Sequence, residues 1–350
     1  MREARAPGRV NLIGDHTDYN EGFVLPAAID LETRVRARSR GDALIRVRSL
    51  GSRVEIRGQE DPRTVEPAWG RYVAAVAGAL AARGRPPIGM DADVSSTVPS
   101  GAGLSSSAAL EVSVALALCD AAGFKLPPVE LALACQEAEQ VARGVPTGIM
   151  DQLSSIAGRA GCALLIDCRS LEVEPIPLPD ELAIVVVHSG IERALEGSAY
   201  AERRADCERV AAALGVAALR DATLEHVADE PRARHVVSEN ARVLASVEAL
   251  KRGDVDALGP LLDASHASLR DDFEVSTPEL DALAEALRSA GALGARLTGA
   301  GFGGCVVALA PREDAERIAG EAVARYRDES GRKPRSWIVR AVDGARMEET

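Results

Sequence analysis

A glycine- and serine-rich segment at residues 99–109, PSGAGLSSSAA, has residue types suited to binding a phosphate group. If a helix begins within it, the first backbone N–H groups of that helix point outward, and the helix dipole adds about half a positive charge there. Such small side chains let a phosphate approach the backbone closely, and the serines could also bind Mg²⁺. A serine-capped helix after a flexible loop would have the same sequence, so the segment alone leaves both interpretations open.

Polar side chains are crowded into a second segment, residues 8–20 (GRVNLIGDHTDYN), where Asp15, His16 and Asp18 occupy three of four positions. Carboxylates and imidazoles form hydrogen bonds with adjacent hydroxyls, so the segment predicts recognition of a polyol. The alternative is a solvated polar turn, in which Asp and Asn side chains bond to their own backbone.

A third segment, residues 147–152 (TGIMDQ), contains a carboxylate, Asp151, next to apolar residues. Such a carboxylate is costly to desolvate unless it is paired. Arg9 would be a suitable partner, and the pair would then lie near a substrate hydroxyl. Alternatively, Asp151 is the N-cap of a helix that begins with QLSSIAG.

The spacing of apolar residues predicts the elements that must position these segments. Stretches 31–39 and 43–49 predict antiparallel strands with arginines on one face, and 88–96 predicts a further strand. Runs 163–167 and 182–190 predict two strands of one sheet, and 294–310 predicts a strand, a glycine loop and a strand. The predicted helices are 69–83, 104–119, 128–143, 198–214, 232–252, 256–270 and 278–290. Helices and strands without regular βαβ alternation indicate the α+β class.

The length of the chain indicates its number of domains, and its net charge restricts the kinds of molecule that it can bind. At one domain per roughly 100–200 residues, the 350 residues predict two lobes. The net charge of −12 repels nucleic acid and anionic lipid, so we expect neither as a partner and expect a small molecule instead. The six cysteines include no C-x-x-C pair, and no apolar run reaches about 18 residues. These features, and the lack of a signal peptide pattern, predict a cytoplasmic protein.

Lysine occurs only three times, at Lys125, Lys251 and Lys333. None of the three lies in the G-x-x-x-x-G-K-[ST] context of a P-loop or the V-A-I-K context of a protein kinase. If this protein binds phosphate, then arginine, backbone amides, helix dipoles and metal must do so.

Together these segments resemble the galactokinases of the GHMP kinase superfamily. The similarity covers nearly the whole chain in order. Its seven blocks are APGRVNLIGDHTDYNEGFVLP, VPSGAGLSSSAALEV, GIMDQ, LLIDCRSLE, SAYAERRADCE, SHASLRDDFEVSTPELD and RLTGAGFGGC.

The resemblance implies a two-lobed α+β fold with the active site in the cleft between the lobes. Residues 1–172 would form an N-terminal lobe with the phosphate loop and most sugar contacts. Residues 173–350 would form a C-terminal lobe with a third glycine-rich motif at 298–304. The implied activity is ATP-dependent phosphorylation of the anomeric hydroxyl of galactose to galactose 1-phosphate, with Mg²⁺ as cofactor.

The resemblance also assigns roles to individual residues. Asp151 matches the family's general base or orienting group, and Arg9 matches its catalytic arginine. The sugar-binding positions match Asp15, His16, Asp18, Gly148 and Tyr200. The ATP-binding positions match Trp69 and Tyr72 near the adenine, and Gly101, Gly103, Leu104, Ser105, Ser106 and Ser107 at the phosphates. The magnesium ligands match Glu139 and either Ser106 or Ser107.

Two departures from the family pattern concern the sugar. Asp15 stands where the family usually has Glu, and Thr147 stands where Cys is common. The shorter Asp15 side chain leaves open another sugar, such as N-acetylgalactosamine or arabinose. A further alternative is a non-catalytic sugar and ATP sensor, but such relatives have a damaged phosphate loop, and residues 103–109 are complete here.

Overall fold

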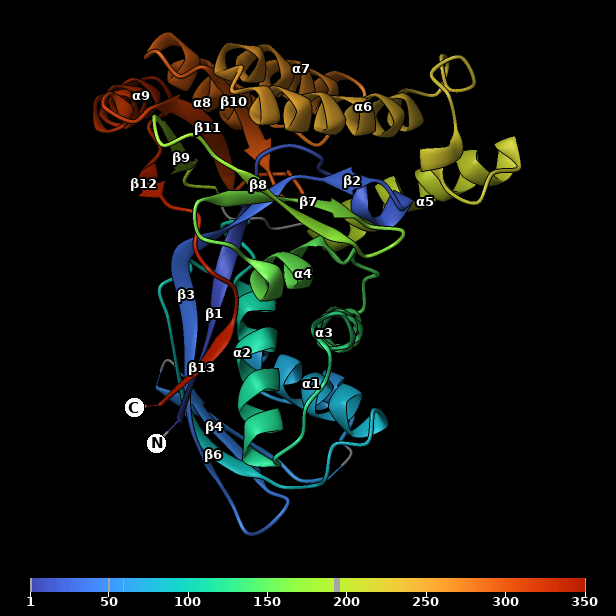
Figure 1. Ribbon diagram of the computed structural model, residues 1–350, viewed down its shortest axis with the longest axis vertical. Helices are drawn as coiled ribbons and strands as arrows, with labels where there is room; N and C mark the ends of the chain where they lie inside the picture. The colour runs from blue at the N-terminus through green and yellow to red at the C-terminus, as the bar shows by residue number, and fades with distance from the viewer. Residues whose placement is uncertain (1, 50, 59, 192–195, 350) are drawn as a thin grey trace.

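A six-stranded sheet forms the N-terminal lobe of the computed structural model, which describes residues 2–49, 51–58, 60–191 and 196–349 (Figure 1). Its strand order is β13-β1-β3-β6-β4-β5. The strands are β1 (Arg2–Asn11), β3 (Pro26–Ser39), β4 (Ile45–Ser49), β5 (Ser52–Ile56), β6 (Met90–Ser96) and β13 (Arg346–Glu349). One face packs on α1 (Trp69–Ala82), α2 (Ser106–Ala121) and α3 (Pro128–Arg143).

The alternation of side chains along β3 explains which face is buried. Val35 is fully buried among the helices, while the neighbouring Arg36 points to the other face and pairs with Glu3. The predicted arginine face is therefore present. The predicted strands at 31–39 and 43–49 run antiparallel but are not neighbours, because β6 lies between β3 and β4.

A four-stranded antiparallel sheet, in the order β10-β11-β9-β12, forms the centre of the C-terminal lobe. Its strands are β9 (Leu182–His188), β10 (Gly294–Thr298), β11 (Cys305–Pro311) and β12 (Arg335–Val339). The helices around it are α5 (Glu196–Leu214), α6 (Pro231–Arg252), α7 (Leu258–Asp271), α8 (Pro278–Ser289) and α9 (Ala315–Ser330). All seven predicted helices are thereby confirmed with small shifts at their ends.

Alternate residues of β9 belong to two different cores. Val185 and Val187 pack in the core that contains α8 and α9. Ile184 and Val186 pack in a core that also contains Val10 of β1. The second core therefore includes residues of both sheets and links the two lobes.

A third sheet of three strands, β2 (Phe23–Val24), β7 (Cys162–Asp167) and β8 (Val173–Pro177), lies between the two larger sheets (Figure 1). The prediction that 163–167 and 182–190 share one sheet is wrong, because β7 belongs to this small sheet and β9 to the C-terminal sheet. The segment between them forms β8, whose prolines lie on an edge strand, where missing N–H donors are tolerated.

The short helix α4 (Met150–Ala157) lies beside the third sheet, above α2 in Figure 1. The remaining short helical turns are η1 (Asp18–Asn20), η2 (Pro62–Thr64), η3 (Leu219–Asp221) and η4 (Val255–Ala257). None of the described helices combines the length and the apolar character needed to cross a lipid bilayer.

The chain passes between the sheets more than once. β13 pairs with β1 although the preceding strand, β12, belongs to the C-terminal sheet. β8 follows residue 172 and pairs with β7. The division of the chain into 1–172 and 173–350 stays a prediction.

Candidate active site

A cavity of about 310 Å³ lies where the three predicted segments meet. Its lining includes the start of α2, the turn after β1, the start of α4 and part of the late glycine loop. The predicted site residues that line it are Arg9, Asp15, His16, Asp18, Tyr72, Gly101, Gly103, Ser105, Ser106, Ser107, Glu139, Gly148, Asp151 and Tyr200.

Asp151 is paired with Arg9, as predicted. The Arg9 Nη2 and Nε atoms lie 2.6 and 2.8 Å from Asp151 Oδ1, and Arg9 Nη1 donates to the carbonyl oxygen of Gly103 at 2.7 Å. The Arg9 side chain is almost fully buried, whereas 24% of the Asp151 side chain stays exposed toward the cavity. The N-cap of α4 is Ile149, so the interpretation of Asp151 as an N-cap is wrong.

The second carboxylate oxygen of Asp151 accepts a hydrogen bond from Ser105 Oγ at 2.5 Å. Ser105 is the N-cap residue of α2, but its side chain makes no capping bond to the helix. The N-terminus of the 16-residue helix α2 therefore faces the cavity without a serine cap. This geometry matches an anion site at a helix N-terminus and not the serine-capped alternative.

Asp18 lies against Gly148, and the contact leaves no room for a side chain at position 148. A Cβ atom there would lie 1.7 Å from Asp18 Oδ2. Burial of Asp18, with the nearby charge of Asp151, raises its pKa to about 6. Asp18 and Asp151 are therefore two carboxyls of one cavity whose charges interact.

His16 belongs to a group of aromatic rings at the same side of the cavity. Its Nδ1 lies 2.9 Å from the Tyr19 hydroxyl, and its Nε2 lies 3.2 Å from the carbonyl oxygen of Ala300. The ring centroids of His16 and Tyr200 are 5.7 Å apart. Burial lowers the pKa of His16 to about 3, so the imidazole is neutral at pH 7.

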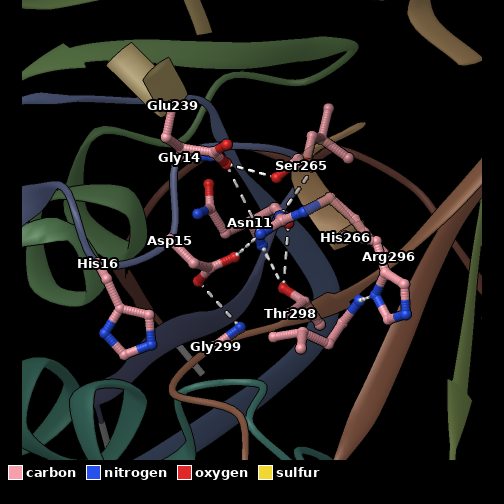
Figure 2. A network of polar contacts seen from close by, with 12 residues as sticks. Asn11, Gly14, Asp15, His16, Glu239, Ser265, His266, Arg296, Thr298 and Gly299 are labelled. Carbon is pink, nitrogen blue, oxygen red and sulfur yellow. Dashed lines mark hydrogen bonds and ion pairs between the residues drawn. The ribbon is translucent and has the colours of Figure 1, made fainter. Parts of the chain in front are cut away.

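Both carboxylate oxygens of Asp15 accept hydrogen bonds from the C-terminal lobe (Figure 2). Arg296 Nη2 donates to Oδ2 at 2.5 Å, and the backbone N–H of Gly299 donates to Oδ1 at 3.0 Å. Burial raises the pKa of Asp15, while the positive charge of Arg296 acts against that increase. Arg296 itself is fully buried.

The buried network extends from Arg296 to Glu239 on α6 (Figure 2). Glu239 Oε1 accepts hydrogen bonds from the Gly14 amide at 2.9 Å and from Ser265 Oγ at 2.5 Å. Burial alone would raise the pKa of Glu239, but the charge of Arg242, with His235 and Arg296, lowers it to about 2. The turn that contains Asp15 and His16 is thus bonded to the C-terminal lobe by charged groups.

Ser107 and Glu139 are adjacent at the phosphate-loop side of the cavity. Ser107 Oγ donates to Glu139 Oε1 at 2.8 Å, and Arg143 Nη1 lies 3.4 Å from the same oxygen. Within the described ranges, no group of three or more His, Cys, Asp or Glu side chains is arranged to bind a metal ion. The hydroxyl and the carboxylate are nevertheless oxygen donors of the kind that Mg²⁺ prefers when it also binds substrate phosphates.

Two predicted ATP-binding residues do not line the cavity. The Trp69 indole donates to Ser52 Oγ at 3.0 Å and packs against the core of the N-terminal lobe, while Tyr72, on the same helix, lines the cavity. The Leu104 side chain is fully buried, and its backbone oxygen accepts a hydrogen bond from the Arg9 amide.

The sequence interpretation missed Arg296, Tyr19 and Arg143. Arg296 had a usable signal, because it is the only charged residue in the apolar strand GARLT, and a buried charge needs a partner. Tyr19 lies within the segment 8–20 and Arg143 ends the predicted helix 128–143, but their residue types alone do not distinguish them from surface residues.

Comparison with known proteins gives three family matches along the chain. Residues 2–39 match the galactokinase galactose-binding signature, 71–159 match the GHMP kinases N terminal domain, and 246–328 match the GHMP kinases C terminal model. The galactokinase of Roseiflexus sp. (strain RS-1) is 47% identical, over 97% of this chain and 91% of that protein. The galactokinase of Chloroflexus aurantiacus is 46% identical, over 98% of this chain and 92% of that protein.

Solved structures give the same result for the fold. Lactococcus lactis galactokinase complexed with galactose superimposes with a TM-score of 0.93 at 34% identity, covering 99% of this chain and 94% of the other. The mevalonate kinase of Methanococcus jannaschii superimposes with a TM-score of 0.70, covering 97% of this chain and 98% of the other. Because the two sequences are only 21% identical, this similarity supports the fold and not the function.

Proposed function

The chain belongs to the galactokinases of the GHMP kinase superfamily, and from this premise we propose that it phosphorylates the anomeric hydroxyl of galactose. The products are galactose 1-phosphate and ADP. One observation carries the proposal. Asp151, the candidate base, is hydrogen-bonded to Ser105, which is the N-cap residue of the candidate phosphate-binding helix. A sugar hydroxyl at Asp151 is therefore next to a phosphoryl group at α2.

Asp151 and Arg9 act on the sugar hydroxyl. Phosphoryl transfer depends mainly on positioning and on neutralisation of charge. Asp151 accepts the hydroxyl proton, or orients the hydroxyl by accepting its hydrogen bond. Arg9 stabilises the carboxylate through two short contacts and places a positive charge near the γ-phosphoryl group.

The start of α2 binds the phosphates through backbone N–H groups and small side chains. Mg²⁺ would be held by Ser107 and Glu139 together with phosphate oxygens, and when bound it neutralises charge on the transferred group. The assignment to Ser107 instead of Ser106 is supported by the hydrogen bond between Ser107 and Glu139.

Asp18, His16, Gly148 and Tyr200 bind the sugar. Asp18 offers carboxylate oxygens to the sugar hydroxyls, and Gly148 leaves the space that Asp18 needs. The neutral imidazole of His16 contacts Tyr19 and Ala300 through its two nitrogens, so a sugar hydroxyl would share or replace one of these contacts. The Tyr200 ring, next to His16, forms part of the wall of the cavity.

A related sugar kinase with another preference is the second candidate function. The observation that favours it is the position of Asp15, whose carboxylate is held by Arg296 and Gly299 at the edge of the cavity. The glutamate that the family usually has at this position is one methylene longer and would extend further into the cavity. The shorter Asp15 leaves more space, so this chain could accept a bulkier sugar such as N-acetylgalactosamine. A non-catalytic sensor is less well supported, because the phosphate loop and Asp151 meet in one cavity.

The decisive experiment measures ADP release from ATP and Mg²⁺ with galactose, N-acetylgalactosamine and arabinose. We expect the highest kcat/KM for galactose, since discrimination between substrates is a ratio of kcat/KM values. A higher value for another sugar would establish the second candidate, and no ADP release with any sugar would leave only the sensor.

A cytoplasmic location stays part of this proposal, because a reducing compartment suits a chain of six cysteine thiols.

A further inference from the structure

Three buried polar side chains, one from each of three helices, form a line of hydrogen bonds behind the phosphate-loop cavity. Gln152 of α4 is central. Its Nε2 donates to Glu139 Oε2 of α3 at 2.9 Å and to Glu111 Oε2 of α2 at 3.0 Å. Gln152 and Glu111 are fully buried, and only 2% of Glu139 is exposed. Neither Gln152 nor Glu111 lines the cavity, so neither is expected to touch substrate.

The spacing along the helices explains this convergence. Ser107 and Glu111 are four residues apart on α2 and therefore share one face of that helix. Asp151 and Gln152 are consecutive on α4, so their side chains point about 100° apart. As a result Asp151 faces Arg9 and the cavity, while Gln152 faces Glu139 and Glu111.

The two carboxylate oxygens of Glu139 have different surroundings. Oε2 accepts the hydrogen bond from Gln152 inside the protein. Oε1 accepts the hydrogen bond from Ser107, and Arg143, one helical turn further along α3, lies 3.4 Å from it. Without the amide of Gln152, Oε2 would lose the donor that the described contacts give it, and the carboxylate could turn to form a two-oxygen pair with Arg143.

We propose that Gln152 is a positioning residue for Glu139, holding Oε2 so that Oε1 stays directed toward Ser107 and a metal ion at the nucleotide phosphates. The inference rests on the proposed function, because Glu139 needs this orientation only if nucleotide and metal bind in the cavity. It also gives α4 two roles, since the same short helix carries the candidate base and holds the candidate metal ligand.

Glu111 Oε2 accepts the second hydrogen bond of the Gln152 amide and so anchors that amide. Burial and the charge of Glu139 raise the pKa of Glu111 well above its ordinary value. Glu111 Oε1 and Gln152 Oε1 are both buried and lack a hydrogen-bond partner in the described structure. Protonation of Glu111 would turn one of its oxygens into a donor and would avoid a second negative charge near Glu139, whereas the Gln152 amide oxygen is an acceptor in either case.

The test compares ADP affinity with and without Mn²⁺ by calorimetry, in the absence of sugar. In the wild-type protein Mn²⁺ should tighten ADP binding. Gln152→Met, which keeps the shape of the side chain and removes its amide, should reduce that effect about 10-fold or more, the usual size for loss of a group that orients a ligand. Metal-free ADP affinity should stay unchanged, which a general loss of structure would not produce.

Two further variants make the test specific. Glu111→Gln keeps a neutral oxygen acceptor for Gln152 and should keep most of the Mn²⁺ effect. Ser154→Ala, a buried position on α4 whose hydroxyl bonds only to the Met150 carbonyl among its described contacts, should keep all of it. If Gln152→Met does not fold, Gln152→Asn withdraws the amide by one methylene and should weaken the effect in the same direction.

A Mn²⁺ effect in Gln152→Met within twofold of wild type would overturn the inference. So would a wild-type protein whose ADP affinity does not respond to Mn²⁺, because Glu139 would then not be a metal ligand. Phosphorylation of galactose is measured separately, so a wild-type protein that binds Mn²⁺ and ADP but does not phosphorylate a sugar contradicts the proposed function alone.

Discussion

Arg296 and Asp15 form an ion pair, with Nη2 2.5 Å from Oδ2, and neither side chain has more than 2% of its surface exposed. Arg296 also donates from Nη1 to the carbonyl oxygens of Asn11 and Leu12, each at 3.1 Å. One guanidinium of β10 thus holds the end of β1 and the turn after it against the C-terminal lobe. Because His16 follows directly, this contact also fixes one wall of the proposed sugar site.

Arg296→Met should therefore reduce the free energy of unfolding by about 3–5 kcal/mol, since it leaves Asp15 buried without its partner. Arg48→Met is the control. Arg48 pairs with Asp93 on the exposed face of the N-terminal sheet, where such a pair contributes about 0–1 kcal/mol. Chemical denaturation of both variants measures the difference. If the Asp15–Arg296 contact is the cause, Asp15→Asn combined with Arg296→Met should cost less than the sum of the two single changes.

Asp15→Glu should change the preference among sugars. The native carboxylate has a partner on each oxygen, so an added methylene must either break a contact with Arg296 or Gly299 or push the carboxylate into the cavity. A change of one methylene in a binding site alters discrimination about 10–200-fold. The kcat/KM ratios of galactose, N-acetylgalactosamine and arabinose measure this change, with the KM of ATP as the internal control. An unaltered sugar profile would mean that Asp15 does not determine specificity.

Most helices and the Arg9–Asp151 pair could be predicted from the sequence, and the contacts of Asp15 could not. Apolar periodicity determines which face of a helix or strand is buried, and this explains why α1, α2 and α3 were predicted well. Periodicity does not identify the partner of a strand, so the apolar runs of β7 and β9 were wrongly assigned to one sheet.

In the candidate site, too, some residues could be predicted from the sequence and others could not. The proposed phosphate loop and the proposed base, Asp151, could be identified because their residue types indicate their chemistry. Arg296, Gln152 and Glu111 act through contacts that form only when distant helices and strands pack together. A single sequence shows that such polar residues are unusual in apolar surroundings, but it does not show which partner each one meets.

Gly148→Ala should weaken sugar binding. The new Cβ would lie 1.7 Å from Asp18 Oδ2, so the Asp18 carboxylate must move from its place in the cavity. The KM of galactose should rise at least about 10-fold, the effect of losing one hydrogen bond to a charged group, while the KM of ATP changes little. Gly78→Ala on α1 is a matched control, because a Cβ there meets no atom within 4 Å. A galactose KM equal to wild type would show that Asp18 does not bind the sugar.

Asp18→Asn should stabilise the protein at neutral pH. Burial raises the pKa of Asp18 from 3.8 to about 6, so between these values the folded state holds a proton that the unfolded state has lost. Wild-type stability therefore falls as pH rises through this window, by about 3 kcal/mol at the 1.36 kcal/mol that each pKa unit represents.

The variant lacks this dependence, so its advantage in free energy of unfolding should grow between pH 4 and about pH 6 and then level off. His16 and His235, whose lowered pKa values act in the opposite direction, are present in both proteins. Their contribution cancels in the difference between the two denaturation curves. An advantage that is equal at pH 4 and pH 7 would contradict a protonated Asp18.

Asp151→Asn should reduce kcat about 10²–10⁴-fold, the range for loss of a group that transfers a proton. The amide keeps the size of the side chain, and its oxygen can still accept the hydrogen bond from Ser105, so α2 should stay in place. The KM of ATP should therefore change little, as expected when the lost interaction acts mainly in the transition state. Steady-state kinetics with saturating galactose measures both constants. Asp93→Asn, at a half-exposed position on β6 paired with Arg48, should leave both near wild type. Turnover of Asp151→Asn within a few-fold of wild type would mean that another group receives the proton, or that the hydroxyl reacts without a base.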